Sequence, residues 1–519
     1  MPPPPHFRVV IAGAGFAGLG AAIRLKEDGE EDFLVLERAQ DVGGTWRDNT
    51  YPGCACDVQS HLYSFSFAPN PGWSRRFSPQ AEILEYLRRC TERFAIRPHL
   101  RFGHEISSAE WQEGSRRWRI QTVRGCFTAD ILVVATGALS DWALPEMAGL
   151  AAFEGPVFHS ARWNHGFDLT GKRVAVVGTG ASALQFVPEI QRRVDQLFLF
   201  QRTPRWVLPR FDNTVSEYER RLFARMPWAQ RAARAVIYGL RELFVLCLKS
   251  PRVLRRVEGL ARWHLARAIA DPTLRQKLTP QYSIGCKGVL LSDDYYPALA
   301  QPNVHLVTDE IREFRRNAVV TADGREREID AVIFATGFRV VDRPIAGRIL
   351  GRGGIRLRDA WRGSPKAHLG ITVSGYPNLF MLLGPNTGLA HSSVVVMIES
   401  QLGFLRAAMT FMRREGIVAI EPKPEVQEAS VAAIDRQLEN SVWNRGGCRS
   451  GYRDATGRNS ALWPSFTFVY RARVARFKPS EYLLERSQSR VAGRRKAPSW
   501  RAARSAVVPG RMGQIPHTG

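Results

Sequence analysis

The chain has 519 residues, of which 45% are hydrophobic and 24% charged, and this composition is typical of a globular protein of two to four domains. Its formal net charge is +24 at pH 7. Eight basic residues and no Asp or Glu lie between Arg486 and the carboxyl end, so we predict that residues 486–519 form a basic, disordered tail. Because a third of the positive excess lies in this tail, we expect no specific nucleic-acid partner.

The amino terminus and the cysteines indicate the compartment. Residues 1–6 lead directly into an apolar strand and lack the charged start and long apolar run of a secretory signal. The seven cysteines form neither a Cys-x-x-Cys pair nor a zinc-type array, so we expect a reducing cytoplasm and no metal site. Arg241 and Glu242 interrupt the apolar residues 235–248, and we expect no transmembrane segment. The Arg-rich residues 217–275 leave peripheral contact with an anionic membrane open.

A first β-α-β unit lies at the amino terminus. Residues 7–12 and 33–37 read as buried strands, and the Ala/Gly-rich residues 18–26 between them have helix length. In such a unit, glycines permit a tight turn, a close approach to a pyrophosphate and close helix packing, while the helix amino terminus offers free N–H groups to the anion. We therefore predict a dinucleotide site at Gly13, Gly15, Phe16, Ala17 and Gly18.

The same plan returns later in the chain. Residues 173–177 and 197–202 read as strands around a helix at 181–190. In the turn between them alanine stands in place of the last glycine, which the packing argument tolerates. The second predicted dinucleotide site comprises Gly178, Thr179, Gly180, Ala181 and Ser182.

Glu37 and Arg202 distinguish the two sites. Each lies 24 residues after the first glycine of its turn. A carboxylate accepts hydrogen bonds from a ribose 2′-OH, whereas a guanidinium, with Thr203 beside it, binds a 2′-phosphate. A hydrogen bond to a charged group contributes about 1.5–3 kcal/mol, so Arg202 predicts a preference for NADPH over NADH of about tenfold to a hundredfold. We assign FAD to the first site and NADPH to the second.

Two apolar strands end in the same tripeptide, Ala-Thr-Gly, at residues 135–137 and 335–337. Each is expected to mark a crossing between domains. The predicted fold is α/β, with two Rossmann-like dinucleotide-binding domains, the second inserted into the first, and a helical subdomain. The predicted bounds are residues 1–142 and 330–485 for the FAD-binding domain, and 143–329 for the NADP-binding domain with its helical insert at 212–281.

The segment between the two sites resembles a family fingerprint. Residues 153–164 carry Phe153, Gly155, His159 and Trp163 at the spacing found in the Baeyer–Villiger monooxygenase branch of the flavin-containing monooxygenases. Similar family segments lie at residues 43–46, 51–57, 285–287 and 384–391, and the resemblance spans residues 9–470.

The resemblance implies a reaction. NADPH reduces FAD, the reduced flavin adds O2, and a C4a-peroxyflavin transfers one oxygen atom to a ketone, giving an ester or lactone, or to a soft heteroatom. It also implies roles for single residues. Asp57 is expected near the flavin ring, His159 is expected to couple domain movement to NADP binding, and Lys287 should join Arg202 on the 2′-phosphate. The remaining cofactor-binding residues that it implies are Gly44, Thr45, Trp46, Tyr63 and Gln185.

The chain departs from the family at Gly288, where the pattern after Lys287 usually places an arginine. Three readings stay open: another arginine takes over, the enzyme oxygenates sulfur or nitrogen, or the chain is an NADPH-oxidising member impaired in Baeyer–Villiger chemistry. A remote alternative is a non-enzymatic nucleotide-binding protein with a basic tail. No motif sets the substrate or the oligomeric state.

Overall fold

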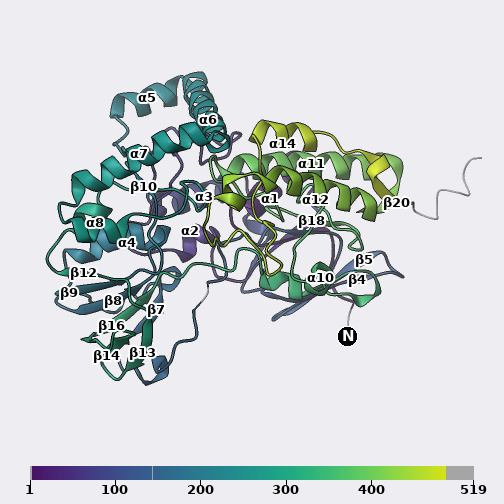
Figure 1. Cartoon of the computed structure of the whole chain (residues 1–519). Helices are drawn as coiled ribbons and strands as arrows, with labels where there is room; N and C mark the ends of the chain where they lie inside the picture. Colours follow the sequence, from purple (N-terminus) through teal and green to yellow (C-terminus); the bar gives the residue numbers. More distant parts are fainter. Residues whose placement is uncertain (1–2, 143, 487–519) are drawn as a thin grey trace, which may run out of the picture.

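The computed structural model describes residues 3–142 and 144–486, and Figure 1 shows its two sheets with the helices that cover them. The first sheet is mixed and the second is parallel. In strand order, the first consists of β17 (Ile349–Leu350), β4 (Ile106–Gln112), β5 (Arg117–Thr122), β6 (Gly125–Val134), β1 (His6–Ala12), β2 (Phe33–Glu37) and β3 (Leu100–Phe102), with β18 (Leu379–Met381) also on β6. The second consists of β12 (Val304–Val307), β9 (Gln196–Phe200), β8 (Arg173–Val177), β16 (Ala331–Phe334) and β7 (Val157–His159).

Three small sheets complete the strands. They are β10 (Val207–Leu208) with β11 (Leu290–Leu291), the meander β13 (Ile311–Arg315), β14 (Ala318–Thr321) and β15 (Glu326–Glu328), and β19 (Ile417–Pro422) with β20 (Tyr482–Arg486). Arg486 therefore ends a strand, and its assignment to the tail is wrong. The rest of the predicted tail, 487–519, lies outside the described residues.

The helices fall into three groups. The chain segments that carry the first sheet and the segment after it contain α1 (Phe16–Glu27), α2 (Thr45–Asp48), α3 (Gln80–Arg93), α10 (Leu357–Trp361), α11 (Val394–Glu415), α12 (Pro424–Glu439), α13 (Val442–Arg445) and α14 (Thr467–Val474). Beside the second sheet lie α4 (Ala181–Gln191) and α9 (Tyr295–Leu299). Within the predicted helical insert the structure has α5 (Glu217–Arg225), α6 (Pro227–Lys249), α7 (Pro251–Ala268) and α8 (Pro272–Leu278), at the upper left of Figure 1.

Both predicted β-α-β units are present, with small shifts at their ends. The helix of the first, α1, begins at Phe16, two residues earlier than expected, because the turn ends at Gly15. In the second unit, β9 ends at Phe200, so Arg202 lies in the loop that follows the strand. Parallel pairing of β1 with β2 and of β8 with β9 brings both turns to the carboxyl ends of their sheets.

The return of the chain to the first sheet comes later than predicted. Residue 330 as the boundary is wrong, because the next strand, β16, pairs with β8 and β7 of the second sheet. The first sheet resumes only at β17, which pairs with β4. A short buried apolar strand carries no signal that chooses between two parallel sheets, so pairing partners decide its place.

The two crossing segments run beside each other. A β-bridge joins Trp142, which follows β6, to Phe338, which follows β16. The backbone N–H of Arg339 also donates to the carbonyl of Asp141 at 2.9 Å. These contacts form the connection between the two sheets.

Helix α11 is long and apolar enough to cross a membrane by composition, with a mean hydropathy of 1.4. However, 56% of that stretch is buried inside the protein, and α11 packs against α1, α14 and β19. This is the packing of a core helix.

Candidate active site

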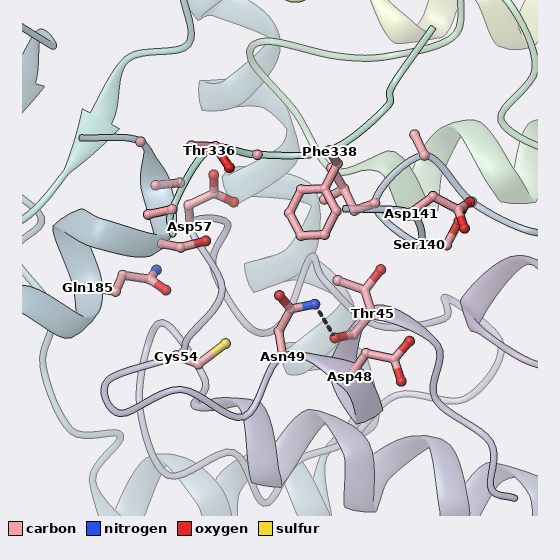
Figure 2. Close-up of a pocket in the computed structure, with 18 of the residues that line it drawn as sticks. Thr45, Asp48, Asn49, Cys54, Asp57, Ser140, Asp141, Gln185, Thr336 and Phe338 are labelled. Carbon is pink, nitrogen blue, oxygen red and sulfur yellow. Dashed lines mark hydrogen bonds between the residues drawn. The ribbon is translucent and has the colours of Figure 1, made fainter. Parts of the chain in front are cut away.

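A cavity of about 1800 Å³ lies at the carboxyl ends of both sheets and is lined by both dinucleotide turns. Figure 2 shows part of its wall, where residues from α2, α4 and the crossing segments meet. Among the predicted site residues only Gly18 and His159 do not line it. Those that do are Gly13, Gly15, Phe16, Ala17, Glu37, Gly44, Thr45, Trp46, Asp57, Tyr63, Gly178, Thr179, Gly180, Ala181, Ser182, Gln185, Arg202, Thr203 and Lys287.

The first turn has the geometry that a pyrophosphate cradle requires. Gly13 has φ +103°, and a Cβ there would lie 2.8 Å from the carbonyl oxygen of Ala135. A Cβ at Gly18 would overlap the carbonyl oxygen of Gly13, so this glycine lets helix and strand pack closely, as predicted. Gly44 approaches from the next loop, where its Cβ would lie 3.2 Å from the Cα of Gly15. The backbone therefore leaves open the space that a diphosphate needs.

Glu37 ends β2 and is buried at the wall of this cradle. Its carboxylate accepts the backbone N–H of Ala14 and of Ala39, each at 2.9 Å, and forms a 3.1 Å ion pair with Arg47. A carboxylate has about four acceptor positions, so capacity for a ribose hydroxyl remains. Sequence reasoning missed Arg47, because α2 brings it to Glu37 only in the folded chain.

The second turn repeats the first. Gly178 has φ +109°, and its Cβ would lie 2.6 Å from the carbonyl oxygen of Ala335. Each turn thus lies against the alanine of one Ala-Thr-Gly tripeptide. At the position of the third glycine the second unit has Ala183, which is fully buried. Near-equal backbones indicate the same task, which is binding a diphosphate at a helix amino terminus.

Three cations gather beside the second turn. Arg202, Arg205 and Lys287 all line the cavity, and within residues 3–142 and 144–486 none of them forms an ion pair with a carboxylate. Burial, followed by the charges of Arg205 and Arg202, lowers the pKa of Lys287 to about 8. An anion placed among them would relieve this repulsion, which fits a 2′-phosphate. Arg205 was not predicted, because its place in the cluster depends on the fold around Lys287.

The residues expected at the flavin come from two parts of the chain. The indole N–H of Trp46 donates to the Tyr63 hydroxyl at 3.2 Å, so both rings are held at the cavity wall. The side chain of Gln185, on α4, accepts from the Tyr51 hydroxyl at 3.0 Å and donates to the carbonyl of Ala55 at 2.9 Å. Gln185 therefore ties the second dinucleotide unit to the loop that leads to Asp57.

Asp57 is exposed at the cavity wall, where Figure 2 shows it among the lining side chains. In the described parts of the chain its carboxylate forms no ion pair within 4.0 Å. Gly288 has no side chain and therefore cannot form an ion pair with Asp57. The guanidinium of Arg241 lies beside this residue, because it donates to the backbone carbonyl of Asp57 at 3.0 Å.

His159 lies at the crossing of the two segments rather than in the cavity. It is 1% exposed, and its ring packs 5.5 Å from that of Trp142 and 5.8 Å from that of Phe338. Its Nδ1 accepts the backbone N–H of Ala161 at 3.1 Å. Burial lowers the pKa of His159 to about 4, so the ring is neutral at pH 7. A neutral ring packed on both crossing segments suits a linker and not a proton carrier.

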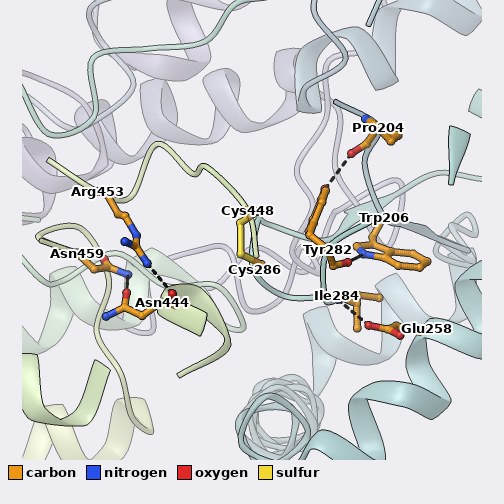
Figure 3. The surroundings of a disulfide bond; sticks show 10 residues. All are labelled: Pro204, Trp206, Glu258, Tyr282, Ile284, Cys286, Asn444, Cys448, Arg453 and Asn459. Atoms are coloured by element: carbon orange, nitrogen blue, oxygen red, sulfur yellow. Dashed lines mark hydrogen bonds between the residues drawn. A yellow bond between two sulfur atoms is a disulfide. The ribbon is translucent and has the colours of Figure 1, made fainter. Parts of the chain in front are cut away.

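Cys286 and Cys448, 162 residues apart, form a disulfide (Figure 3). It joins the loop that carries Lys287 to the segment that carries Tyr452. Sequence reasoning missed the pair, because spacing says nothing about cysteines this far apart. In the described residues no group of three His, Cys, Asp or Glu side chains is arranged to hold a metal ion.

The chain is similar to several known proteins. The flavin-binding monooxygenase-like family model matches residues 6–235. A Baeyer-Villiger monooxygenase of Streptomyces coelicolor is 50% identical over 92% of each chain. The crystal structure of cyclohexanone monooxygenase from Rhodococcus sp. Phi1 bound to NADP⁺ matches 93% of this chain and 100% of its own, with 28% identity and a TM-score of 0.85. The structure of OTEMO in complex with FAD and NADP matches the same shares at 26% identity and a TM-score of 0.84.

Two diphosphate cradles around one cavity, with opposite charges beside them, define a flavoprotein that uses FAD together with a nicotinamide dinucleotide. The cofactors found in the similar structures agree with this class. The chain belongs to the Baeyer–Villiger monooxygenase branch of the flavin-binding monooxygenase-like family. The resemblance expected from the fingerprint is confirmed.

Proposed function

We propose that this protein is an FAD-containing, NADPH-dependent monooxygenase that converts a ketone into an ester or lactone. The overall reaction consumes one ketone, one NADPH, one proton and one O2, and gives one ester, NADP⁺ and water. The observation that carries the proposal is the cavity shared by the two dinucleotide turns, since a hydride donor and a flavin must meet within one enclosed space.

Bound FAD supplies the oxygen-transfer chemistry, and the residues of this chain hold the cofactors and shape the cavity. Glu37, fixed by Arg47, accepts the ribose hydroxyl of the first dinucleotide. The cluster of Arg202, Arg205 and Lys287 binds the 2′-phosphate of the second. Trp46 forms part of the apolar wall that excludes water from the reacting atoms.

The domain division and the role of His159 belong to the proposal. The FAD-binding part comprises residues 1–142 and the chain from about residue 340 to 485, with the boundary moved to follow the strand pairing. The NADP-binding part comprises the chain between them. His159 transmits movement between the two, because its ring packs on Trp142 and on Phe338, one from each crossing segment.

A second candidate reaction, oxygenation of sulfur or nitrogen, is favoured by Gly288. Removing one preorganised charge-stabilising donor costs about a hundredfold to a thousandfold in rate, and soft nucleophiles need less of that help than ketones. The two reactions are separated by offering a cyclic ketone and a thioether to the FAD-loaded enzyme. The proposed function requires lactone in a one-to-one ratio with NADPH consumed. Sulfoxide without lactone would establish the second candidate, and hydrogen peroxide with both substrates would reject both.

Peripheral membrane contact is a further part of the proposal. Tyr218 on α5 and Trp228, Val236 and Leu246 on α6 are all more than half exposed, and basic side chains such as Arg231 lie among them. Exposed apolar side chains beside basic ones suit an anionic lipid surface. Sedimentation with vesicles tests this: W228S/V236S should lose binding to vesicles containing phosphatidylglycerol, while F468S, which removes a half-exposed ring elsewhere, should retain it.

A cytoplasmic location also belongs to the proposal, and the buried free thiols Cys54, Cys56 and Cys90 support it. The disulfide between Cys286 and Cys448 is not what a reducing compartment favours, so the redox state of this pair in cells tests the proposed location. Alkylation of freshly lysed cells, followed by mass spectrometry of both peptides, measures their state, and cell fractionation measures the location.

A further inference from the structure

Helix α6 of the helical insert brings an arginine to the cavity that the two dinucleotide turns share. Arg241 lies within α6 and lines this cavity together with Asp57 and Lys287. Its Nε donates to the side-chain oxygen of Gln59 at 2.8 Å, and its Nη2 donates to the backbone carbonyl of Asp57 at 3.0 Å. These two bonds hold the guanidinium beside Asp57.

The positive charge of Arg241 is not neutralised by a carboxylate. Both of its acceptors are neutral, and across the described residues no ion pair within 4.0 Å includes it. Burial lowers the pKa of Arg241, and the more distant charge of Asp57 opposes this. An arginine stays protonated under such conditions, so the cavity wall carries a partly desolvated cation. A partly desolvated cation that forms no close ion pair attracts an anion that enters the cavity.

Position 288 offers no competing charge. A Cβ built on Gly288 would lie 3.1 Å from the hydroxyl of Tyr452, so the tyrosine occupies the space beside this backbone. The disulfide between Cys286 and Cys448 holds the loop that carries Gly288 against the segment that carries Tyr452 (Figure 3). A long side chain at 288 would have to displace the tyrosine.

Other arginines near the site are engaged elsewhere. Arg210 donates to the carbonyl of Cys56 at 2.9 Å but does not line the cavity. Arg205 lines the cavity beside Lys287, where its charge lowers the pKa of that lysine. Among the described arginines that line the cavity, Arg241 is therefore the one whose guanidinium bonds to Asp57 itself.

We infer that Arg241 stabilises the negative charge that develops beside Asp57 during oxygen transfer, in place of a side chain at position 288. The inference rests on the proposed function for the nature of the reaction. It explains how a chain with Gly288 keeps a cation at this wall, and it gives the helical insert a part in the chemistry.

The test compares three variants of the FAD-loaded enzyme. R241Q removes the charge and keeps a hydrogen-bonding side chain, R241K keeps the charge, and R210Q removes a neighbouring arginine that binds the same loop from outside the cavity. Two quantities are measured: the midpoint potential of the bound FAD, and the fraction of NADPH that yields ester rather than hydrogen peroxide with a cyclic ketone.

We expect R241Q to lower the midpoint potential, because a positive charge favours the reduced flavin, and to reduce ester formation by about a hundredfold to a thousandfold. R241K should recover the potential and part of the ester yield. R210Q should lose thermal stability but keep the wild-type midpoint potential and ester yield. A wild-type potential in R241Q, or an equal fall in R210Q, would overturn the inference. If the wild-type enzyme makes no ester from any ketone, the proposed function fails instead, while the potentials still test Arg241.

Discussion

The two dinucleotide turns have the same backbone and opposite charges. Gly13 and Gly178 have φ of +103° and +109°, and each lies against the alanine carbonyl of an Ala-Thr-Gly tripeptide. Beside the first turn, Glu37 is buried and paired with Arg47. Beside the second, Arg202 is exposed and has no carboxylate partner in the described part of the chain. From this comparison we propose that the turn binds a diphosphate, and that the residue at the end of the second strand, or just after it, selects the nucleotide.

The largest effect should come from replacing the first glycine of each dinucleotide turn by alanine, one turn at a time. Alanine at a φ near +100° costs about 1–3 kcal/mol, and the backbone overlap at Gly13 adds to that cost. We expect G13A to be purified without FAD, and G178A to keep FAD but to lose affinity for NADP⁺ by a hundredfold or more. Flavin absorbance and calorimetric titration with NADP⁺ measure the two losses.

The matched control for these turns is G171A. Gly171 also has a positive φ, of +68°, but a Cβ there meets nothing within 4 Å. It should lose some stability and no cofactor affinity. If G178A lost FAD as readily as G13A, the separate assignment of the two turns would be wrong.

The next largest effect should come from removing the positive charge of Arg202. R202Q should weaken NADPH binding by about tenfold to a hundredfold, because a charge-assisted hydrogen bond to the 2′-phosphate is lost. NADH binding should stay within about twofold, since NADH lacks that phosphate. R192Q, on the exposed end of α4, serves as the control. Steady-state KM values for both coenzymes provide the measurement, and an equal loss for NADH would contradict the assignment.

A smaller effect is expected from pH. Lys287 has a pKa lowered to about 8 before an anion binds, so raising the pH through 8 removes its charge. The 2′-phosphate is already doubly charged there. The affinity for NADP⁺ should therefore fall several-fold between about pH 7 and pH 9, and this dependence should vanish in K287M. A flat profile for the wild-type enzyme would show that Lys287 does not contact the phosphate.

The smallest effect concerns His159. Because burial lowers its pKa to about 4, the imidazole should not titrate between pH 5.5 and 8. A histidine whose pKa is lowered in the folded protein destabilises the fold only when the pH falls below the histidine pKa of the unfolded chain, which is about 6.5. Imidazole signals in NMR spectra of the wild type and H159N identify the ring. A His159 resonance that titrates near pH 6.5 would point to a proton carrier.

The local parts of the fold followed from the sequence. Strands β2 and β8 have the predicted bounds, and β16 ends where predicted, at the Ala-Thr-Gly tripeptide, because a buried run of apolar residues between turn signals is a local pattern. The sheet to which β16 belongs did not follow, since pairing with β8 and β7 depends on the whole chain. Local pattern thus predicts an element but not its neighbours.

The residues of the candidate site likewise fall into those that the sequence predicts and those that it does not. Residues in a fixed relation to a turn, such as Glu37 and Arg202, were found by counting along the chain. Arg47, Arg205 and Arg241 were not, because α2, the loop after β9 and α6 bring them to the cavity only after folding. No motif marks a residue whose importance lies in what it meets across the cavity.

Isotope incorporation measures the proposed oxygenation of a ketone most directly. The FAD-loaded enzyme is supplied with NADPH, a cyclic ketone and ¹⁸O2, and the product is analysed by mass spectrometry. We expect a lactone with one ¹⁸O atom for each NADPH consumed. Unchanged ketone, together with one labelled hydrogen peroxide for each NADPH oxidised, would contradict this prediction.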